Sequence, residues 1–188
     1  MSSRIVIERI AAEDILRENA TAEDLAFVAP FGSASRRREA LAWRAIVRRE
    51  LGADVVISYD DYGAPRVSVP NTYISVSHSR ESVALLVSDN ICAVDIEQAD
   101  RDFSRVANRY LSQSEQMLAE QNDLYAEMWC AKEALYKYYS KGEIDLVKHL
   151  SIKEYNSANG VLVCSILEGE PIEVKVMREE SLAMAVID

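Results

Sequence analysis

Two carboxylates stand two residues apart in the segment ICAVDIE, residues 91–97. The segment reads as a β-strand, and residues two apart on a strand point to the same face. We therefore expect Asp95 and Glu97 to project together, while Val94 and Ile96 point into a core. Neighbouring carboxylates repel each other unless a cation or a shared proton resolves the conflict. Two interpretations fit the pair: a site for Mg²⁺ or Mn²⁺, which prefer oxygen ligands, or an exposed strand end with solvated acids.

A third carboxylate belongs to the segment WCAKEALYK, residues 129–137. In a helix Trp129, Glu133 and Lys137 follow one another at intervals of four residues and share one stripe. The pattern fits a helix-stabilising Glu133–Lys137 pair beside a core tryptophan. It equally fits a Glu133 that faces Asp95 and Glu97, with Lys137 one turn further on to meet an anionic substrate.

The segment VSHS, residues 76–79, holds one of the two histidines of the chain. Strand alternation puts Ser77 and Ser79 on one face and His78 on the other. Adjacent residues on a strand cannot form the Ser–His contact of a nucleophilic pair, and no acid is placed to orient the ring. His78 is therefore a structural histidine or a histidine that contacts phosphate at a strand end.

Positive charge is concentrated in residues 34–49, where six arginines and one glutamate give a local charge of +5 in a chain of net charge −10. Two interpretations remain open for this segment, a solvated helix face and an anion-binding patch.

Helices and strands alternate in two rounds along the chain. A helix-start signal lies at Thr21, and a helix is expected over residues 34–51, closed by Gly52. A capping box at residues 112–115 opens a further helical region, and a strong helix is expected over residues 122–139. Strands are expected over 55–59, 73–79, 82–88 and 91–97, and again in the segments LSIKEY, GVLVCSIL, IEVKVM and SLAMAVI of the tail.

A short internal echo supports two related halves. The segments ESVALLV (81–87) and ESLAMAV (180–186) agree in register at Glu, Ser, Ala and Val. Together with the repeated order, this favours an α+β fold of two similar halves, each a helix packed on a small antiparallel sheet, joined as an intramolecular pseudo-dimer. We expect residues 1–99 to form the N-terminal half and residues 100–188 the C-terminal half.

Composition limits the classes of partner. The chain has 188 residues, of which 49% are hydrophobic and 28% are charged. Such a composition suits a globular core, and a net charge of −10 disfavours nucleic-acid binding, which needs clustered cations. No apolar run is long enough to span a bilayer or act as a signal peptide. The cysteines Cys92, Cys130 and Cys164 have no disulfide or zinc spacing, so we expect a cytoplasmic protein with reduced thiols.

Taken in order, VSHS, VDIE and WCAKEALYK resemble the motifs of the 4′-phosphopantetheinyl transferases. The length of the chain resembles the surfactin-synthetase-activating type, which is a pseudo-dimer in one chain. The resemblance implies transfer of 4′-phosphopantetheine from coenzyme A to a serine of an apo acyl or peptidyl carrier protein, with 3′,5′-ADP as the second product. It also implies a monomer that depends on Mg²⁺, with Mn²⁺ as a possible substitute.

The resemblance assigns roles to individual residues. Metal ligands would be Asp95, Glu97 and Glu133, and the catalytic residues would be Glu133, Lys137 and His78. Glu133 is the expected base for the serine proton. His78, Lys132 and Lys137 would also contact the phosphates of coenzyme A. Glu115 matches the acidic residue that follows the metal strand in the family.

Two departures from the family pattern concern the nucleotide. Gly63-Ala64-Pro65 stands where the family often has Gly-Lys-Pro or Gly-Arg-Pro, so Arg66 is the expected substitute for the missing cation. Within the basic segment, Arg38 and Arg44 best fit the spacing of residues that bind the 3′-phosphate. Two other functions fit the same residues: a coenzyme A or carrier-protein binding module without catalysis, and a carboxylate–metal phosphohydrolase.

Overall fold

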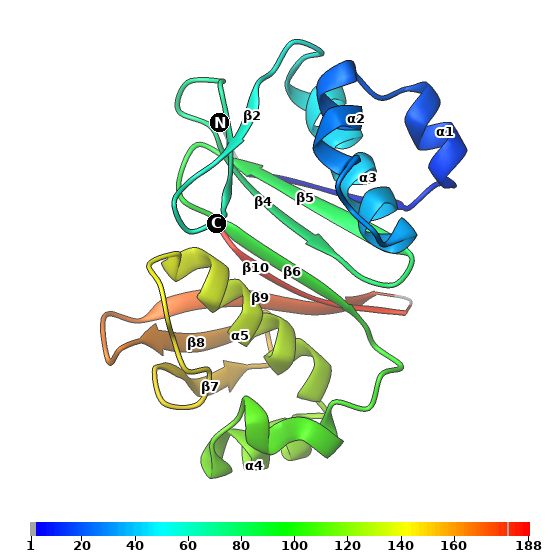
Figure 1. Ribbon diagram of the computed structural model, residues 1–188. Helices are drawn as coiled ribbons and strands as arrows, with labels where there is room; N and C mark the ends of the chain where they lie inside the picture. Colours follow the sequence, from blue (N-terminus) through cyan, green and yellow to red (C-terminus); the bar gives the residue numbers. More distant parts are fainter. Residues whose placement is uncertain (1–2, 180) are drawn as a thin grey trace.

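The computed structural model describes residues 3–179 and 181–188. It consists of two halves, each with a long helix against an antiparallel sheet (Figure 1). The prediction of an α+β fold with two sheet-containing halves is confirmed.

The first half carries a three-stranded sheet of order β1-β5-β4 and a separate β2-β3 hairpin. Its elements are β1 (Arg4–Arg9), α1 (Glu13–Glu18), α2 (Ala22–Val28), α3 (Ala34–Leu51), β2 (Ile57–Tyr59), β3 (Pro65–Val67), β4 (Tyr73–His78) and β5 (Ser82–Ser88). The helix predicted over 34–51 has these bounds because Ser33 caps its start and Gly52, at φ 116°, ends it. Its apolar face packs on β5 and β4 through Trp43, Ile46 and Val47.

β1 is one of the elements that sequence analysis did not anticipate, with α1, β3 and the 3₁₀ helix η1 (Ser104–Arg109). It pairs antiparallel with β5 and forms the outer strand of the first sheet. Charged residues flank its short apolar run, and Ile5 and Ile7 remain more than a third exposed. A strand with so little buried surface gives a weak sequence signal.

The second half carries a five-stranded sheet of order β6-β10-β9-β8-β7. Its elements are β6 (Ala93–Gln98), the 3₁₀ helix η1 (Ser104–Arg109), α4 (Gln113–Asn122), α5 (Tyr125–Tyr139), β7 (Leu150–Asn156), β8 (Val161–Ile166), β9 (Ile172–Glu179) and β10 (Leu182–Ile187). The predicted capping box is present, since Ser112 and Glu115 cap each other's backbone. The helix predicted over 122–139 begins at Tyr125 because Asp123, with a left-handed backbone, ends α4.

Strand order relates the two halves to each other. β5 follows β4 in a hairpin and pairs with β1 on its other side. β10 follows β9 in a hairpin and pairs with β6 on its other side. The echoing segments 81–87 and 180–186 thus fall on equivalent strands, although Glu180 lies outside the described residues.

β6 belongs to the second sheet by its hydrogen bonds. It pairs antiparallel with β10, for example Asp95 opposite Ala185. The predicted division after residue 99 puts β6 in the N-terminal half, whereas its partner β10 lies in the C-terminal half. By its hydrogen bonds, the chain passes from the first sheet to the second between β5 and β6.

The two sheets meet where β4 lies beside β6 (Figure 1). Behind this junction, Leu86, Val94, Ile96 and Met184 form a small shared core. A contact so deeply buried fixes the halves relative to each other. No helix in the described part of the chain is both long and apolar enough to cross a membrane.

Candidate active site

β6 positions the two carboxylates of the VDIE segment as strand alternation predicts. Val94 and Ile96 lie in the shared core, so Asp95 and Glu97 point to the opposite face. Asp95 is only 6% exposed, which excludes the interpretation of a solvated acid at a strand end. A carboxylate this deeply buried requires partners.

The partners of Asp95 come from both halves of the molecule. Its Oδ1 accepts hydrogen bonds from Ser77 Oγ on β4, at 2.7 Å, and from Lys137 Nζ on α5, at 2.7 Å. The Lys137 ammonium also donates to the carbonyl oxygens of Val94 on β6, at 2.9 Å, and Val76 on β4, at 3.3 Å. Lys137 therefore connects α5 to both strands of the junction.

Glu133 lies one turn before Lys137 on α5 and is half-buried near the same carboxylates. Burial raises the pKa of Glu133, and the negative charges of Asp95 and Glu97 raise it further, against the attraction of Lys137. The three carboxylates therefore interact with one another, as the second interpretation of the helix stripe requires. The ion pair of Lys137 is made with Asp95.

Glu97 lies at the other end of the cluster. Burial raises the pKa of Glu97, and the Asp95 charge adds to this effect, whereas Arg101 and a hydrogen bond with Trp129 oppose it. Arg101 Nη1 lies 3.4 Å from Glu97 Oε1. Trp129, which lies on the same face of α5 as Glu133 and Lys137, thus forms a hydrogen bond with Glu97.

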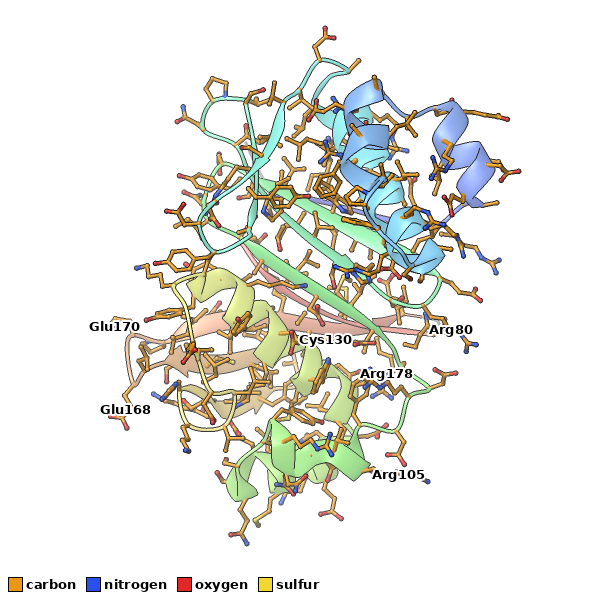
Figure 2. The ribbon with its side chains drawn as sticks, viewed as in Figure 1. Arg80, Arg105, Cys130, Glu168, Glu170 and Arg178 are labelled. Atoms are coloured by element: carbon orange, nitrogen blue, oxygen red, sulfur yellow. The ribbon has the colours of Figure 1, made fainter. Side chains whose placement is uncertain are left out.

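Cys130 closes the buried side of the cluster. Figure 2 labels it on α5, and its Sγ lies 3.5 Å from the carbonyl oxygen of Ala183 on β10. Burial raises the pKa of this thiol well above its usual range, and the charges of Asp95 and Glu97 add to the effect. The thiol is therefore neutral and acts as packing beneath the acids.

A cavity of about 730 Å³ adjoins the cluster. One wall is the β2-β3 hairpin, including Gly63, Pro65 and Arg66, and the opposite wall is the end of α5, including Tyr136 and Lys137. Arg66 also lies 2.6 Å from Asp60, which holds its guanidinium in the hairpin. Lys137 both lines the cavity and binds Asp95, so it connects the cavity to the carboxylates, which do not themselves line it.

His78 and Arg38 lie on the α3 side of the first sheet. His78 continues the face of β4 that packs on α3, and its Nδ1 is 3.6 Å from Glu39 Oε2. Arg38 donates to the backbone carbonyl oxygens of Ile10 and Ala11, each at 3.2 Å. Neither residue lines the cavity described above.

The structure places Arg44 inside the first half. It is 1% exposed, pairs with Asp24 and Glu23 of α2, and stacks over Phe27. Its charge therefore joins α2 to α3. Its contact with the 3′-phosphate stays a prediction.

Lys132 also lies inside the molecule. It is fully buried, and its ammonium donates to Glu115 Oε1 at 2.8 Å and to the carbonyl oxygens of Leu146 and Leu150. An ammonium group has three protons, and these contacts use all of them. Glu115 also accepts from the backbone N–H of Ile152, so the pair joins α4, α5 and β7 and leaves no donor for a substrate.

The comparison with protein families decides the relationship. Residues 91–186, from just before β6 almost to the end of β10, match the model of the 4′-phosphopantetheinyl transferase superfamily. The chain belongs to the 4′-phosphopantetheinyl transferase superfamily. Asp95, Glu97, Glu133 and Lys137 all lie within the matched segment, whereas His78 and Arg66 precede it.

A curated relative in the superfamily is the 4′-phosphopantetheinyl transferase ffp of Bacillus subtilis. It is 32% identical to the chain over 97 residues, which cover 48% of the chain and 43% of the relative. The chain thus matches less than half the length of this relative.

The carboxylate cluster suits the divalent metal that superfamily members use. Within residues 3–179 and 181–188, no three His, Cys, Asp or Glu side chains are arranged so as to hold a metal ion. The chemistry of the side chains nevertheless suits such a metal, because three carboxylates interact electrostatically and Lys137 supplies a single positive charge against them. A divalent cation would relieve the same repulsion that raises the pKa of Glu97 and Glu133.

Two features of this superfamily site were not found by sequence analysis. Several tyrosines line the cavity, including Tyr62, Tyr73, Tyr136 and Tyr139. Tyr136 and Tyr139 are three residues apart on α5, as on one helix face, but only the fold brings them to Tyr62 and Tyr73. The contact between Ser77 and Asp95 left a signal in the alternating serines of segment 75–79, but their partner strand could not be read from the sequence.

Proposed function

We propose that the protein transfers 4′-phosphopantetheine from coenzyme A to a serine of an apo acyl or peptidyl carrier protein and releases 3′,5′-ADP. The observation that carries the proposal is the position of Lys137. This residue lines the cavity and binds Asp95 at 2.7 Å, so a phosphate held by Lys137 would lie beside the carboxylate cluster.

The cavity is the proposed site of the nucleotide end of coenzyme A. Its volume of about 730 Å³ falls in the range typical of small-molecule sites. Tyrosine rings offer flat surfaces for the adenine, and Arg66 offers a planar donor set for a phosphate. Lys137 would then bind the pyrophosphate. His78 and Arg38 remain proposed phosphate contacts from the α3 side.

Asp95, Glu97 and Glu133 would hold Mg²⁺ or Mn²⁺. When bound, this cation would neutralise negative charge on the pyrophosphate. Lys137 adds a positive charge from the chain itself, held in place by the backbone carbonyl oxygens of Val76 and Val94. A charge fixed before the reaction stabilises the developing negative charge without reorganisation.

The reaction is a substitution at the phosphorus that carries pantetheine. The serine oxygen of the carrier protein forms a bond to this phosphorus, the bond to the oxygen of the leaving nucleotide breaks, and the serine proton must be removed. We propose Glu133 as the acceptor of this proton. Glu133 is a carboxylate one helical turn from Lys137, the residue proposed to hold the phosphate.

One assay tests the proposed function. The protein is incubated with coenzyme A, Mg²⁺ and an apo carrier protein, and the mass of the carrier is measured. We expect the carrier to gain the mass of one phosphopantetheine group, with one equivalent of 3′,5′-ADP. Cleavage of coenzyme A without modification of the carrier would indicate a phosphohydrolase. Binding of coenzyme A without either product would indicate a binding module.

A further inference from the structure

The junction between the halves is made by a row of serine hydroxyls. Ser75 Oγ accepts from the backbone N–H of Val94 at 3.0 Å, and Ser77 Oγ accepts from that of Ile96 at 3.2 Å. Ser79 Oγ accepts from the side-chain amide of Gln98 at 3.1 Å. The constant offset of 19 residues shows that β4 and β6 run parallel here. Side chains of β4 thus take the place of a backbone ladder.

Ser77 differs from the other serines of the row in its second hydrogen bond. Its hydroxyl has one proton, and that proton is donated to Asp95 Oδ1 at 2.7 Å. The hydrogen bond that Ser77 Oγ accepts from the Ile96 N–H of β6 holds this oxygen in place. The hydroxyl proton of Ser77 is therefore left to point toward Asp95. Through Ser77, the backbone of β6 therefore restricts where the Asp95 carboxylate can lie.

Ser77 and Lys137 bind the same oxygen of Asp95, and the Cys130 thiol also forms a hydrogen bond with this carboxylate. Ser77 and Lys137 each lie 2.7 Å from Oδ1, and neither bond reaches Oδ2. Two bonds from different directions to one oxygen restrict rotation of the carboxylate. The second oxygen is thereby held in a fixed direction relative to β6 and α5.

We propose that Ser77 is a positioning residue that orients the Asp95 carboxylate for the divalent cation. The inference rests on the proposed function, because it assigns Asp95 to the metal. It gives Ser77 a role through Asp95, without contact with coenzyme A. Groups that orient a metal ligand in this way typically contribute about 10- to 100-fold to metal affinity.

Ser75 provides a matched control. Ser75 and Ser77 lie on the same strand, are each 5% exposed and each accept a hydrogen bond from a backbone N–H of β6. Only Ser77 binds Asp95, whereas Ser75 also lines the cavity, so coenzyme A must be saturating in the comparison. Substituting either serine by alanine removes its bond to the β6 backbone, and Ser77→Ala also removes the bond to Asp95. Both variants should therefore lose stability, and Ser77→Ala should lose more.

The experiment measures Mg²⁺ binding by calorimetry on protein saturated with coenzyme A, without carrier protein, so that no transfer occurs. We expect Ser77→Ala to weaken Mg²⁺ binding about 10- to 100-fold and Ser75→Ala to leave it within about twofold of wild type. Both variants should melt at a lower temperature than wild type, Ser77→Ala at the lower of the two, because it loses a second hydrogen bond. Equal weakening of Mg²⁺ binding in both variants, or no weakening in Ser77→Ala, would overturn the inference.

A second pair of variants keeps the test valid if the alanine variant does not fold. Ser77→Thr and Ser77→Val have nearly the same shape, but only threonine keeps the hydroxyl. Mg²⁺ binding should be stronger in Ser77→Thr than in Ser77→Val by about tenfold or more, and equal binding would contradict the proposal. Failure of the wild-type protein to bind Mg²⁺ would instead overturn the assignment of Asp95 to the metal, and with it this inference.

Discussion

The chemistry of the site is concentrated in one buried carboxylate. Asp95 lies on β6 and contacts both halves of the molecule. It binds Ser77 of the first half and Lys137 on α5 of the second half. Burial raises the pKa of two further acids, Glu97 and Glu133, and the negative charge of Asp95 adds to this effect. A substitution at Asp95 therefore tests whether activity can be lost while the fold is kept.

We predict that Asp95→Asn reduces phosphopantetheine transfer by at least about 100-fold, as loss of one preorganised charged group commonly does. The fold should persist, because Lys137 keeps its bonds to the carbonyl oxygens of Val76 and Val94. The increase in melting temperature that Mg²⁺ produces with coenzyme A should disappear. Asp100→Asn, an exposed acid on the same segment, is the control. Normal turnover of Asp95→Asn at saturating Mg²⁺ would refute the metal assignment.

A second prediction concerns Arg66 in the cavity wall. We expect Arg66→Ala to raise the KM for coenzyme A by about tenfold with little change in kcat, the pattern of lost uniform binding. Arg9→Ala is a suitable control, because Arg9 is also an exposed arginine paired with one acid, at 2.8 Å, on a distant strand. An unchanged KM in Arg66→Ala would show that the cavity does not hold a phosphate at this wall.

At the scale of elements, buried ion pairs lock helices to one another. α2 is joined to α3 by Asp24, which is 2% exposed and accepts hydrogen bonds from Arg44 and Arg48. In the second half, Lys132 and Glu115 join α4, α5 and β7 in the same manner. Arg44, Lys132 and Glu115 were taken from the sequence as candidates or matches for the site, because charged residues near motifs look alike whether they face a ligand or another helix.

The α2–α3 pair predicts how stability depends on pH. Burial alone would raise the pKa of Asp24, but hydrogen bonds from Arg48, Arg44 and Thr21 bring it well below its usual value of 3.8. A lowered pKa in the folded state stabilises the protein above the unfolded value, and this contribution is lost as the pH falls below it. We therefore expect Asp24→Asn to lower the free energy of unfolding by about 3 kcal/mol at pH 7.

The difference between wild type and Asp24→Asn should shrink as the pH is lowered below 3.8. Urea unfolding at several pH values measures it. Asp54→Asn, at an exposed position, should show no such dependence. A difference that stays constant from neutral to acid pH would contradict the role given to Asp24.

At the scale of the whole molecule, one chain supplies both sides of the site. Ser77 and Arg66 come from the first half, whereas Asp95, Glu133 and Lys137 come from the second sheet and its helix. The shared core behind the junction holds these contributions together. A site complete within one chain does not require a second copy.

We predict that the protein is a monomer that binds one coenzyme A per chain. Light scattering should give a mass near 21.1 kDa, and a calorimetric titration should saturate at one equivalent. An obligate trimer, or two coenzyme A molecules per chain, would refute the pseudo-dimer interpretation of function.

Much of this arrangement could be predicted from local patterns. Alternation on β6 and helical spacing on α5 were enough to put Asp95, Glu97, Glu133 and Lys137 on the correct faces of their elements. The parallel approach of β4 to β6 left no local signal, because its hydrogen bonds run through side chains 19 residues apart. The burial of Arg44 and Lys132 likewise could not be predicted, because it depends on the packing of helices against each other, and spacing along one helix does not encode that packing.

The serine row of β4 has a consequence for solubility. β6 is an outer strand of the five-stranded sheet, and free N–H groups along such a strand recruit strands from other chains. Ser75 and Ser77 occupy the N–H groups of Val94 and Ile96, so the sheet ends at this edge. If the first half detached, this edge would become a template for self-association. Docking of the two halves therefore protects the chain from aggregation as well as assembling its active site.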